Sequence, residues 1–266
     1  MFSLKNKNII ITGGGGFLAR NFIKGILEYG GNPIILENST SKIIDLKKYF
    51  NLSLGKIPDT YKIDISNWKS VKKNSLYLKK KYKKIDGLIN NAARNPVFEN
   101  KKKNYTFENF NLVEWNNDCK IGLTGSIICT QIYGTLISKN KNGGSILNIS
   151  SDLGLISPDQ RLYRSKRKKN FEKPVSYSVV KSGLIGLTKF TSTYWANKKV
   201  RCNCICPGGV ENKHDRSFLN KISRLIPLGR LAKKDEYNGL VVFLMSDASS
   251  YINGATISAD GGRTAW

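Results

Sequence analysis

The chain has 266 residues, and its 44 Lys and Arg residues against 19 Asp and Glu residues give a formal net charge of +25. This length is enough for one large α/β domain, which forms its core without a disulfide or a metal. Hydrophobic residues make up 40% of the chain and aromatic residues 10%, which excludes intrinsic disorder. No apolar run reaches about eighteen residues and no signal peptide is recognisable, so we expect a cytoplasmic protein without membrane association.

The positive charge comes mainly from 34 lysines, against 10 arginines. Arginine is favoured for bidentate contacts with phosphate, so this lysine excess does not favour a nucleic-acid surface. The five cysteines are odd in number, and Cys202, Cys204 and Cys206 alternate along a predicted strand at a spacing that no common zinc motif uses. We therefore expect free thiols and no metal site.

The first half of the chain alternates predicted strands and helices. Residues 8–12 predict a strand, four glycines follow, and residues 17–29 carry apolar side chains at helical spacing. Further strands are predicted at residues 33–37, 61–64 and 85–90, separated by segments that are compatible with helices. This alternation of apolar strands and helices predicts a parallel sheet that is covered on both faces.

The second half continues this alternation with no shift in composition that would mark a second domain. We predict a Rossmann-type, doubly wound sheet of seven parallel strands, in one domain over residues 1–266. The elements predicted here are a helix at 115–139, a strand at 145–150, a helix at 175–196, a strand at 200–206, a helix at 234–245 and a strand at 255–258.

A glycine-rich turn joins the first strand to the first helix. Backbone N–H groups and the positive end of the helix can hold a pyrophosphate there, and glycine lets the phosphate come close. The second strand ends at Glu37, about twenty residues further on, where a carboxylate can accept hydrogen bonds from an adenosine ribose. This carboxylate would repel a 2′-phosphate, so we expect NAD rather than NADP, although Lys42 nearby leaves NADP open. The turn reads Thr12-Gly13-Gly14-Gly15-Gly16-Phe17-Leu18-Ala19.

A second group of polar residues lies further along the chain. Tyr177 and Lys181 are four residues apart at the start of a predicted helix, which places them on one face. A nearby ammonium lowers the pKa of a tyrosine towards the range that an acid/base catalyst needs. The preceding strand ends at Ser150 and Ser151, which can present a hydroxyl to the same site. Together they predict Ser151 to hold a substrate oxygen, Tyr177 to move its proton and Lys181 to tune Tyr177.

With these residues the chain resembles the single-domain short-chain dehydrogenases/reductases, from about Asn8 to Trp266. In that family a Gly-rich turn, an Asn-Asn-Ala-Gly segment, a catalytic Ser, a Tyr-x-x-x-Lys pair and a Pro-Gly loop recur in this order. Ser151 rather than Ser150 matches the family's spacing to the next Gly, Gly154. The similar segments here are residues 12–19, Asn90-Asn91-Ala92-Ala93, Ser151, Tyr177 with Lys181, and Pro207-Gly208-Gly209-Val210, with Asp260-Gly261-Gly262 near the end.

The resemblance implies an NAD(P)-dependent oxidoreductase that interconverts a secondary alcohol and a ketone, with Ser151, Tyr177 and Lys181 as catalytic residues. It implies that Lys181 also binds the nicotinamide ribose and that the chain forms a homo-oligomer, a dimer or a tetramer, through its two long helices. The cofactor-binding residues it implies are Gly13, Gly16, Phe17, Leu18, Glu37, Asp64, Ile65, Asn91, Ala92, Ala93, Tyr177, Lys181, Pro207, Gly208, Val210 and Asn212.

The chain departs from the family pattern at three places. The glycine turn has the spacing Gly-x-x-Gly-x-x-Ala, which is similar to the extended branch of the superfamily. Asn212 stands where a cofactor-binding Thr is usual. Gly122 stands where the family has an Asn that supports a water-linked proton relay; a water in the vacant volume, Asn116 or Asn117 are the substitutes we consider.

The segment between Ser151 and Tyr177 is longer than is common in the family. It resembles the segment in dehydrogenases of bacterial surface-sugar and flagellin-modification pathways, which implies a role in carbohydrate metabolism. We expect Arg161 or Arg164 to bind a phosphate or carboxylate of a sugar substrate, because arginine offers a planar bidentate fork. The alternative is a solvated basic loop, which we favour for residues 166–169.

Two other functions stay open. One is reduction of a ketoacyl group on an acidic carrier protein, although Glu37 argues against the NADPH that such reductases usually take. The other is a non-catalytic nucleotide-binding protein whose cationic surface holds RNA or another polyanion, although Ser151, Tyr177 and Lys181 are all present. A hydrolase is excluded because His214 is the single histidine and no Gly-x-Ser-x-Gly elbow occurs.

Overall fold

The order of the strands determines where this protein can bind a ligand. The computed structural model describes residues 2–94, 106–163 and 172–266. Its sheet has seven strands in the order β3-β2-β1-β4-β5-β6-β7, and every neighbouring pair is parallel. The predicted Rossmann-type sheet is confirmed. The strands are β1 Asn8–Thr12, β2 Asn32–Glu37, β3 Asp59–Lys62, β4 Gly87–Asn90, β5 Gly144–Ile149, β6 Val200–Pro207 and β7 Thr256–Ala259.

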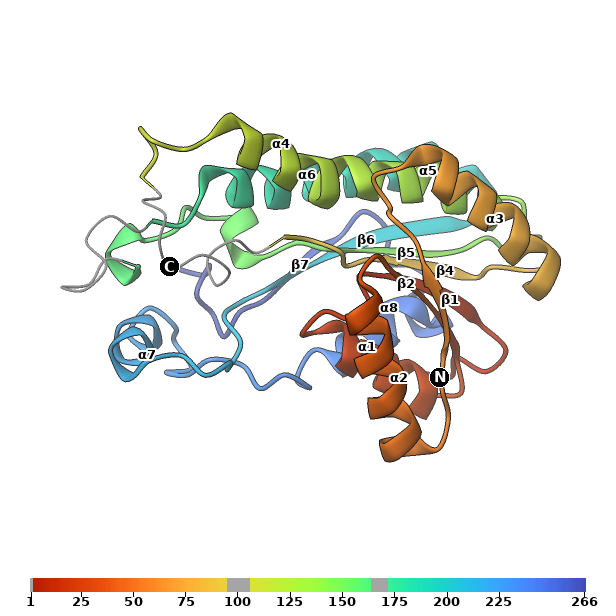
Figure 1. Ribbon diagram of the computed structural model, residues 1–266, viewed down its shortest axis with the longest axis horizontal. Helices are drawn as coiled ribbons and strands as arrows, with labels where there is room; N and C mark the ends of the chain where they lie inside the picture. Colours follow the sequence, from red (N-terminus) through yellow and green to blue (C-terminus); the bar gives the residue numbers. More distant parts are fainter. Residues whose placement is uncertain (1, 95–105, 164–171) are drawn as a thin grey trace.

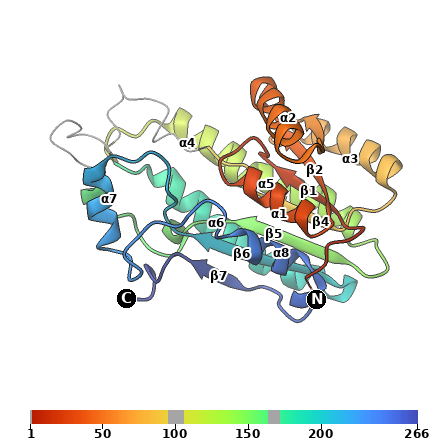
Figure 2. The same ribbon diagram turned by 90° about the horizontal axis from the view of Figure 1, so that it is seen from below.

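Helices cover both faces of this sheet (Figures 1 and 2). In Figure 1, α3, α4, α5 and α6 lie above the sheet, and α1, α2 and α8 lie below it. Because the strands are covered on both sides, alternate residues of one strand enter different cores. The helices are α1 Ala19–Glu28, α2 Thr40–Leu54, α3 Trp68–Tyr82, α4 Leu112–Cys119, α5 Gly125–Ile137, α6 Val175–Tyr194, α7 Arg216–Ser223 and α8 Asn238–Met245.

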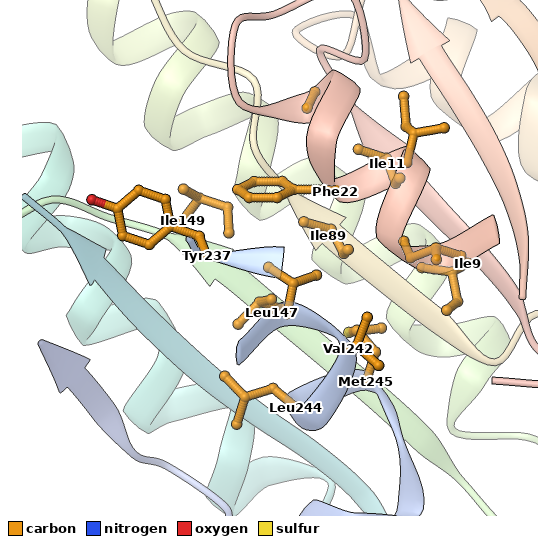
Figure 3. Close-up of a cluster of buried hydrophobic side chains, with 14 of the residues drawn as sticks. Ile9, Ile11, Phe22, Ile89, Leu147, Ile149, Tyr237, Val242, Leu244 and Met245 are labelled. Atoms are coloured by element: carbon orange, nitrogen blue, oxygen red, sulfur yellow. The ribbon is translucent and has the colours of Figure 1, made fainter. Parts of the chain in front are cut away.

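Successive side chains of β1 belong to two different hydrophobic cores. Ile9 and Ile11 pack with Phe22 of α1 and Val242 of α8 (Figure 3). Ile10 points to the opposite face and belongs to the core formed with α3 and α5. Each core side chain is removed from water, which stabilises the fold by about 1.5–3 kcal/mol for each large apolar residue.

The sequence-based boundaries differ from the structure in a few places. The predicted helix at 115–139 is interrupted by a π-helical turn, Lys120–Thr124, which separates α4 from α5. The helix predicted at 234–245 begins at Asn238, and β3 lies two residues earlier than predicted. Helix α7 was not predicted; Asp215 caps it and Ile222 packs in a small separate cluster. Figure 1 shows α7 beyond the end of the sheet, away from the two main cores.

Two further observations concern cysteines and membranes. All five cysteines are free, and Cys202, Cys204 and Cys206 are buried along β6. Within residues 2–94, 106–163 and 172–266, no helix combines the length and the apolar character needed to cross a lipid bilayer.

Candidate active site

A cleft of about 720 Å³ opens at the carboxyl ends of the strands. It begins at the glycine turn after β1 and extends past the ends of β4, β5 and β6 to α7. The order of β1 and β4 makes this the point where a doubly wound sheet binds ligands. Every cofactor-binding and catalytic residue that the sequence predicted lines this cleft: Gly13, Gly16, Phe17, Leu18, Glu37, Asp64, Ile65, Asn91, Ala92, Ala93, Ser151, Tyr177, Lys181, Pro207, Gly208, Val210 and Asn212.

The glycine turn is held against the end of β4 at close range. Gly13 has a φ of 64°, and a Cβ there would lie 2.8 Å from the Cα of Ala92. The Asn91 side-chain amide donates to the carbonyl oxygens of Thr12 (3.0 Å) and Gly13 (3.2 Å). The Thr12 hydroxyl oxygen accepts from the backbone N–H groups of Asn91 and Ala92. Asn91 therefore shapes the turn as well as lining the cleft.

The start of α1 fits a phosphate group. The N-cap residue before it, Leu18, makes no side-chain capping bond, whereas Ser39 caps α2 and Asn67 caps α3. The first N–H groups of a helix have no partner inside the helix, and an anion can accept from them. Gly13 and Gly16 of the turn in front of α1 line this end of the cleft without a Cβ, so a phosphate can come close to their backbone.

Glu37 is fixed at the end of β2. Its side chain is buried, and one carboxylate oxygen accepts from the backbone N–H groups of Asn38 (3.0 Å) and Ser39 (3.1 Å). The other oxygen accepts from the backbone N–H of Gly15 (3.0 Å). The carboxylate is thus oriented beside the glycine turn, where a ribose bound to this turn would meet it. Lys42 of α2 lines the same end.

The two serines after β5 have different environments. The Ser150 hydroxyl donates to the carbonyl of Lys181 at 2.7 Å and ties β5 to α6. The Ser151 hydroxyl donates to Asp152 at 2.7 Å, and its hydrogen bond with Tyr177 lowers the pKa of that phenol. Ser151 is therefore the serine that contacts Tyr177.

Tyr177 and Lys181 lie one turn apart on α6. The Lys181 ammonium donates to the carbonyl of Ile149 at 2.8 Å and lies 5.7 Å from the centroid of the Tyr177 ring. Burial lowers the pKa of Lys181 to about 8. Burial raises the pKa of Tyr177 to about 12, Ser151 acts against this rise, and the charge of Asp152 adds to it. The phenol is therefore protonated at neutral pH unless nearby positive charge favours its ionised form.

The volume beside Gly122 is not vacant. A Cβ at Gly122 would lie 2.6 Å from Cγ1 of Val180, so the valine side chain fills the space where a larger residue would point. The expected water in this volume is therefore wrong. Asn116 and Asn117 are exposed on α4 and are not among the residues that line the cleft. Neither is placed to substitute for the relay Asn.

The structure does not bring Arg161 into the cleft. Its guanidinium makes hydrogen bonds of 2.8–3.2 Å to Asp159, and its side chain is 87% exposed. Arg161 is not among the residues that line the cleft, because this ion pair holds it on the outer side of its turn. Arg164 lies outside the described residues.

Other charged residues line the substrate end instead. Arg263 donates to Asp152 at 2.6 Å, and both side chains are almost fully buried. Arg94, just after β4, contacts Glu114 at 3.0 Å, and Lys173 lies two residues before α6. Sequence reasoning missed all three basic residues. The available signals were the position of Arg94 after the Asn91–Ala93 segment and of Lys173 four residues before Tyr177.

Comparisons with known proteins identify the family of the chain. A family model described as enoyl-(acyl carrier protein) reductase matches residues 48–264. The NADH-dependent L-xylulose reductase of Ambrosiozyma monospora is 30% identical, over 97% of this chain and 94% of that protein. Post-translational flagellin modification protein A of Campylobacter coli is 26% identical, over 97% of this chain and 98% of that protein. The protein belongs to the short-chain dehydrogenase/reductase family.

A solved structure shows the same architecture. The short-chain dehydrogenase of Leptospira borgpetersenii with bound NAD+ superposes with a TM-score of 0.85 at 27% identity, over 98% of this chain and 94% of that one. The relatives include NADH-dependent and NADP-dependent enzymes. The protein is thus an oxidoreductase that acts on CH–OH groups with NAD or NADP.

Proposed function

We propose that this protein is an NAD-dependent dehydrogenase, formed by one domain over residues 1–266, that interconverts a secondary alcohol and a ketone on a sugar of surface-glycan biosynthesis. The proposal rests on one observation: Ser151, Tyr177 and Lys181 line the same cleft as the glycine turn. One end of the cleft fits a dinucleotide, and the other presents an acid/base pair to a hydroxyl group.

Tyr177 is the residue that moves the substrate's hydroxyl proton. Ser151 holds the substrate oxygen next to the phenol, and Lys181 supplies positive charge that favours the phenolate. The bound nicotinamide supplies hydride acceptance and donation. The residues that hold it in this proposal are the cleft-lining residues of the glycine turn, of the β4 end and of the Pro207–Val210 segment.

The preference for NAD rests on Glu37. Three backbone N–H groups hold its carboxylate beside the glycine turn, where a carboxylate would repel a 2′-phosphate. We expect NAD to give a kcat/KM at least about tenfold above that of NADP, since one like-charge contact costs about 1.4 kcal/mol or more. Glu37→Gln should reduce this ratio towards one. An unchanged ratio in this variant would show that Glu37 does not determine the preference for NAD.

A sugar substrate is supported by the relatives named above, one a sugar reductase and one a flagellin-modification protein. The test is a panel of sugars, sugar acids, sugar phosphates and ketoacyl thioesters, with reduced nicotinamide followed by absorbance. The proposal expects turnover of a sugar derivative that disappears in Tyr177→Phe. Turnover confined to ketoacyl thioesters would favour the carrier-protein reductase, which the description of the matching family model supports.

The non-catalytic alternative rests on the net charge of +25 and on Gly122. It predicts salt-dependent RNA binding that survives Tyr177→Phe, with no turnover on any member of the panel. Turnover that depends on Tyr177 would contradict it.

We also propose that the chain forms a homo-oligomer through α4, α5 and α6. Each of these helices exposes large apolar side chains, and such side chains mark protein contacts where they form a contiguous patch. Sedimentation of the full chain should give a dimer or a tetramer, and a monomer at micromolar concentration would contradict the proposal. The exposed residues are Leu112, Val113, Ile127, Val179 and Phe190.

A further inference from the structure

The proton of Ser151 is held by the next residue in the chain. The Ser151 hydroxyl donates to one carboxylate oxygen of Asp152 at 2.7 Å. The backbone N–H of Leu153 donates to the same carboxylate oxygen at 2.8 Å and to the Ser151 oxygen at 3.2 Å. A hydroxyl has one proton and two lone pairs, so the Ser151 oxygen can only accept from other groups while Asp152 accepts its proton.

The other oxygen of the Asp152 carboxylate is bound by Arg263. The Arg263 guanidinium donates to it at 2.6 Å, and the Arg263 and Asp152 side chains are only 6% and 4% exposed. Arg263 belongs to a C-terminal turn in which the Asp260 carboxylate accepts from the N–H groups of Gly262 and Thr264, at 2.9 Å each. Asp152 is thus held on both sides, and it lines the cleft at a fixed place.

Tyr177 and Asp152 compete for the proton of Ser151. Burial raises the pKa of Tyr177 to about 12, a hydrogen bond from Ser151 lowers it, and the charge of Asp152 adds to the rise. Ser151 stabilises the phenolate only while its proton points to the phenol. A hydrogen bond to a charged acceptor is about twice as strong as one between neutral groups, and in the structure the carboxylate has the proton.

We propose that Asp152 is a positioning residue for the reaction: its carboxylate turns the Ser151 hydroxyl away from the phenol and holds Tyr177 as the proton donor of the site. In ketone reduction the O–H bond of Tyr177 breaks, its proton bonds to the substrate oxygen, and the electron pair stays on the phenolate. Asp152 favours the form of Tyr177 that this step needs, and Arg263 offsets part of the carboxylate charge. This inference rests on the proposed dehydrogenase function of the same cleft.

The other titratable groups near the pair do not change in the variants that test this role. Burial lowers the pKa of Lys173 to about 7, so its charge is lost before the alkaline range in which Tyr177 ionises. A displacement of the Tyr177 ionisation in these variants is therefore an effect of the pair itself. The groups that face Tyr177, Asp152 or Arg263 are Lys173 before α6, Lys181 of α6, Cys206 of β6, Tyr163, Tyr237 and Asp159.

The test follows the ionisation of Tyr177 in the full chain loaded with NAD+. A carbon-13 label at Cζ of the tyrosines reports phenolate formation by NMR, and the resonance of Tyr177 is the one that Tyr177→Phe lacks. In Asp152→Asn the midpoint of this ionisation should fall by at least about one pH unit, because the negative charge is gone and the Ser151 proton is released to the phenol. In Arg263→Gln it should rise, because the carboxylate then lacks the charge that offsets it.

The double variant Asp152→Asn with Arg263→Gln keeps the inference testable if either single variant does not fold. Its two amides can hydrogen-bond each other in place of the ion pair, and its midpoint should also fall, since a neutral amide competes less strongly for the Ser151 proton. The matched control is Asp159→Asn with Arg161→Gln, which neutralises an exposed pair outside the cleft and should leave the midpoint unchanged. The dissociation constant for NAD+ checks that each variant is folded.

The outcomes separate this inference from the proposed function. With NAD+ binding intact, an unchanged midpoint in Asp152→Asn and in the double variant, or a fall in Arg263→Gln as well, would overturn the role of Asp152. A fall of the same size in the control pair would also overturn it. Failure of the unmodified chain to bind NAD+, or turnover that is independent of Tyr177, contradicts the dehydrogenase proposal itself.

Discussion

The two ends of the cleft are built in different ways. At the nucleotide end, the turn after β1, the Asn91 amide and the Glu37 carboxylate are joined by hydrogen bonds that involve backbone groups. At the substrate end, charged side chains from distant parts of the chain contact one another, as Arg263 and Asp152 do. Few substitutions are compatible with a backbone conformation that hydrogen bonds fix in this way. Side chains that contact one another can be replaced by other side chains. The nucleotide end therefore depends on backbone geometry, and the substrate end depends on which side chains the fold brings together.

The largest effect is expected from Tyr177→Phe. The variant keeps the ring but removes the hydroxyl that transfers the proton, so kcat/KM should fall at least about a thousandfold. Because the nucleotide end is untouched, the dissociation constant for NADH should stay within about twofold, measured by fluorescence. An equal loss of NADH binding would show that the two ends are not independent.

Arg263→Met should cause the next largest effect, on stability. The variant leaves the buried carboxylate of Asp152 without the guanidinium that donates to it at 2.6 Å. Breaking a buried pair in this way lowers the free energy of unfolding by about 3–5 kcal/mol. Urea unfolding measures the change. Arg161→Gln is the control, since its exposed pair with Asp159 should contribute little to the free energy of unfolding. Similar losses in both variants would contradict the importance of the buried pair.

Gly13→Ala should act at the nucleotide end. The new Cβ would lie 2.8 Å from the Cα of Ala92, at a φ of 64° that side chains rarely adopt. We expect a loss of about 1–3 kcal/mol in the free energy of unfolding, together with weaker NADH binding. Gly239→Ala is the matched control, because nothing lies within 4 Å of its Cβ, and alanine should there be neutral or stabilising. Unchanged NADH affinity in Gly13→Ala would show that the turn does not set nucleotide binding.

The smallest effect is expected from Lys181→Met on the pH profile. Alcohol oxidation needs the ionised form of Tyr177, and burial raises the pKa of this phenol to about 12, so kcat/KM rises with pH. The Lys181 ammonium has a pKa of about 8, so it carries the charge that favours the phenolate only below this pH. Lys181→Met should therefore lower kcat/KM by about tenfold below pH 8, the effect of about one pKa unit, and change it little at higher pH. The rate–pH profiles of both proteins check this, and an unchanged profile below pH 8 would contradict the assigned role of Lys181.

The strands and the nucleotide end could be predicted because their signals are local. Runs of apolar residues predict β1 and β2, and the turn between β1 and α1 is contiguous in the chain. Tyr177 and Lys181 lie four residues apart on one helix, so helical geometry alone places them together. The missed helix, α7, has only eight residues and packs in a small cluster away from the main cores, although its Asp215 cap and the helical spacing of its apolar side chains are local signals.

The substrate end could not be predicted because its contacts join distant residues. Arg263 and Asp152 are 111 positions apart, and no periodicity links them. Arg161 and Lys173 are both basic residues of the same segment, and the sequence does not distinguish them. Whether a basic side chain of this segment faces the cleft depends on which side of its turn the residue lies. The ion pair with Asp159 holds Arg161 away from the cleft.

The amino-acid sequence by itself therefore determined the parallel sheet, the glycine turn and the Ser151, Tyr177 and Lys181 group, because strand pattern, turn geometry and helical spacing act over short stretches of chain. The tertiary structure alone decided which charged side chains face the substrate, why Gly122 has no space beside it, and that Lys173 lies against Tyr177. These features depend on how separate elements pack, since burial and the charges of neighbours arise only when the folded chain brings them together.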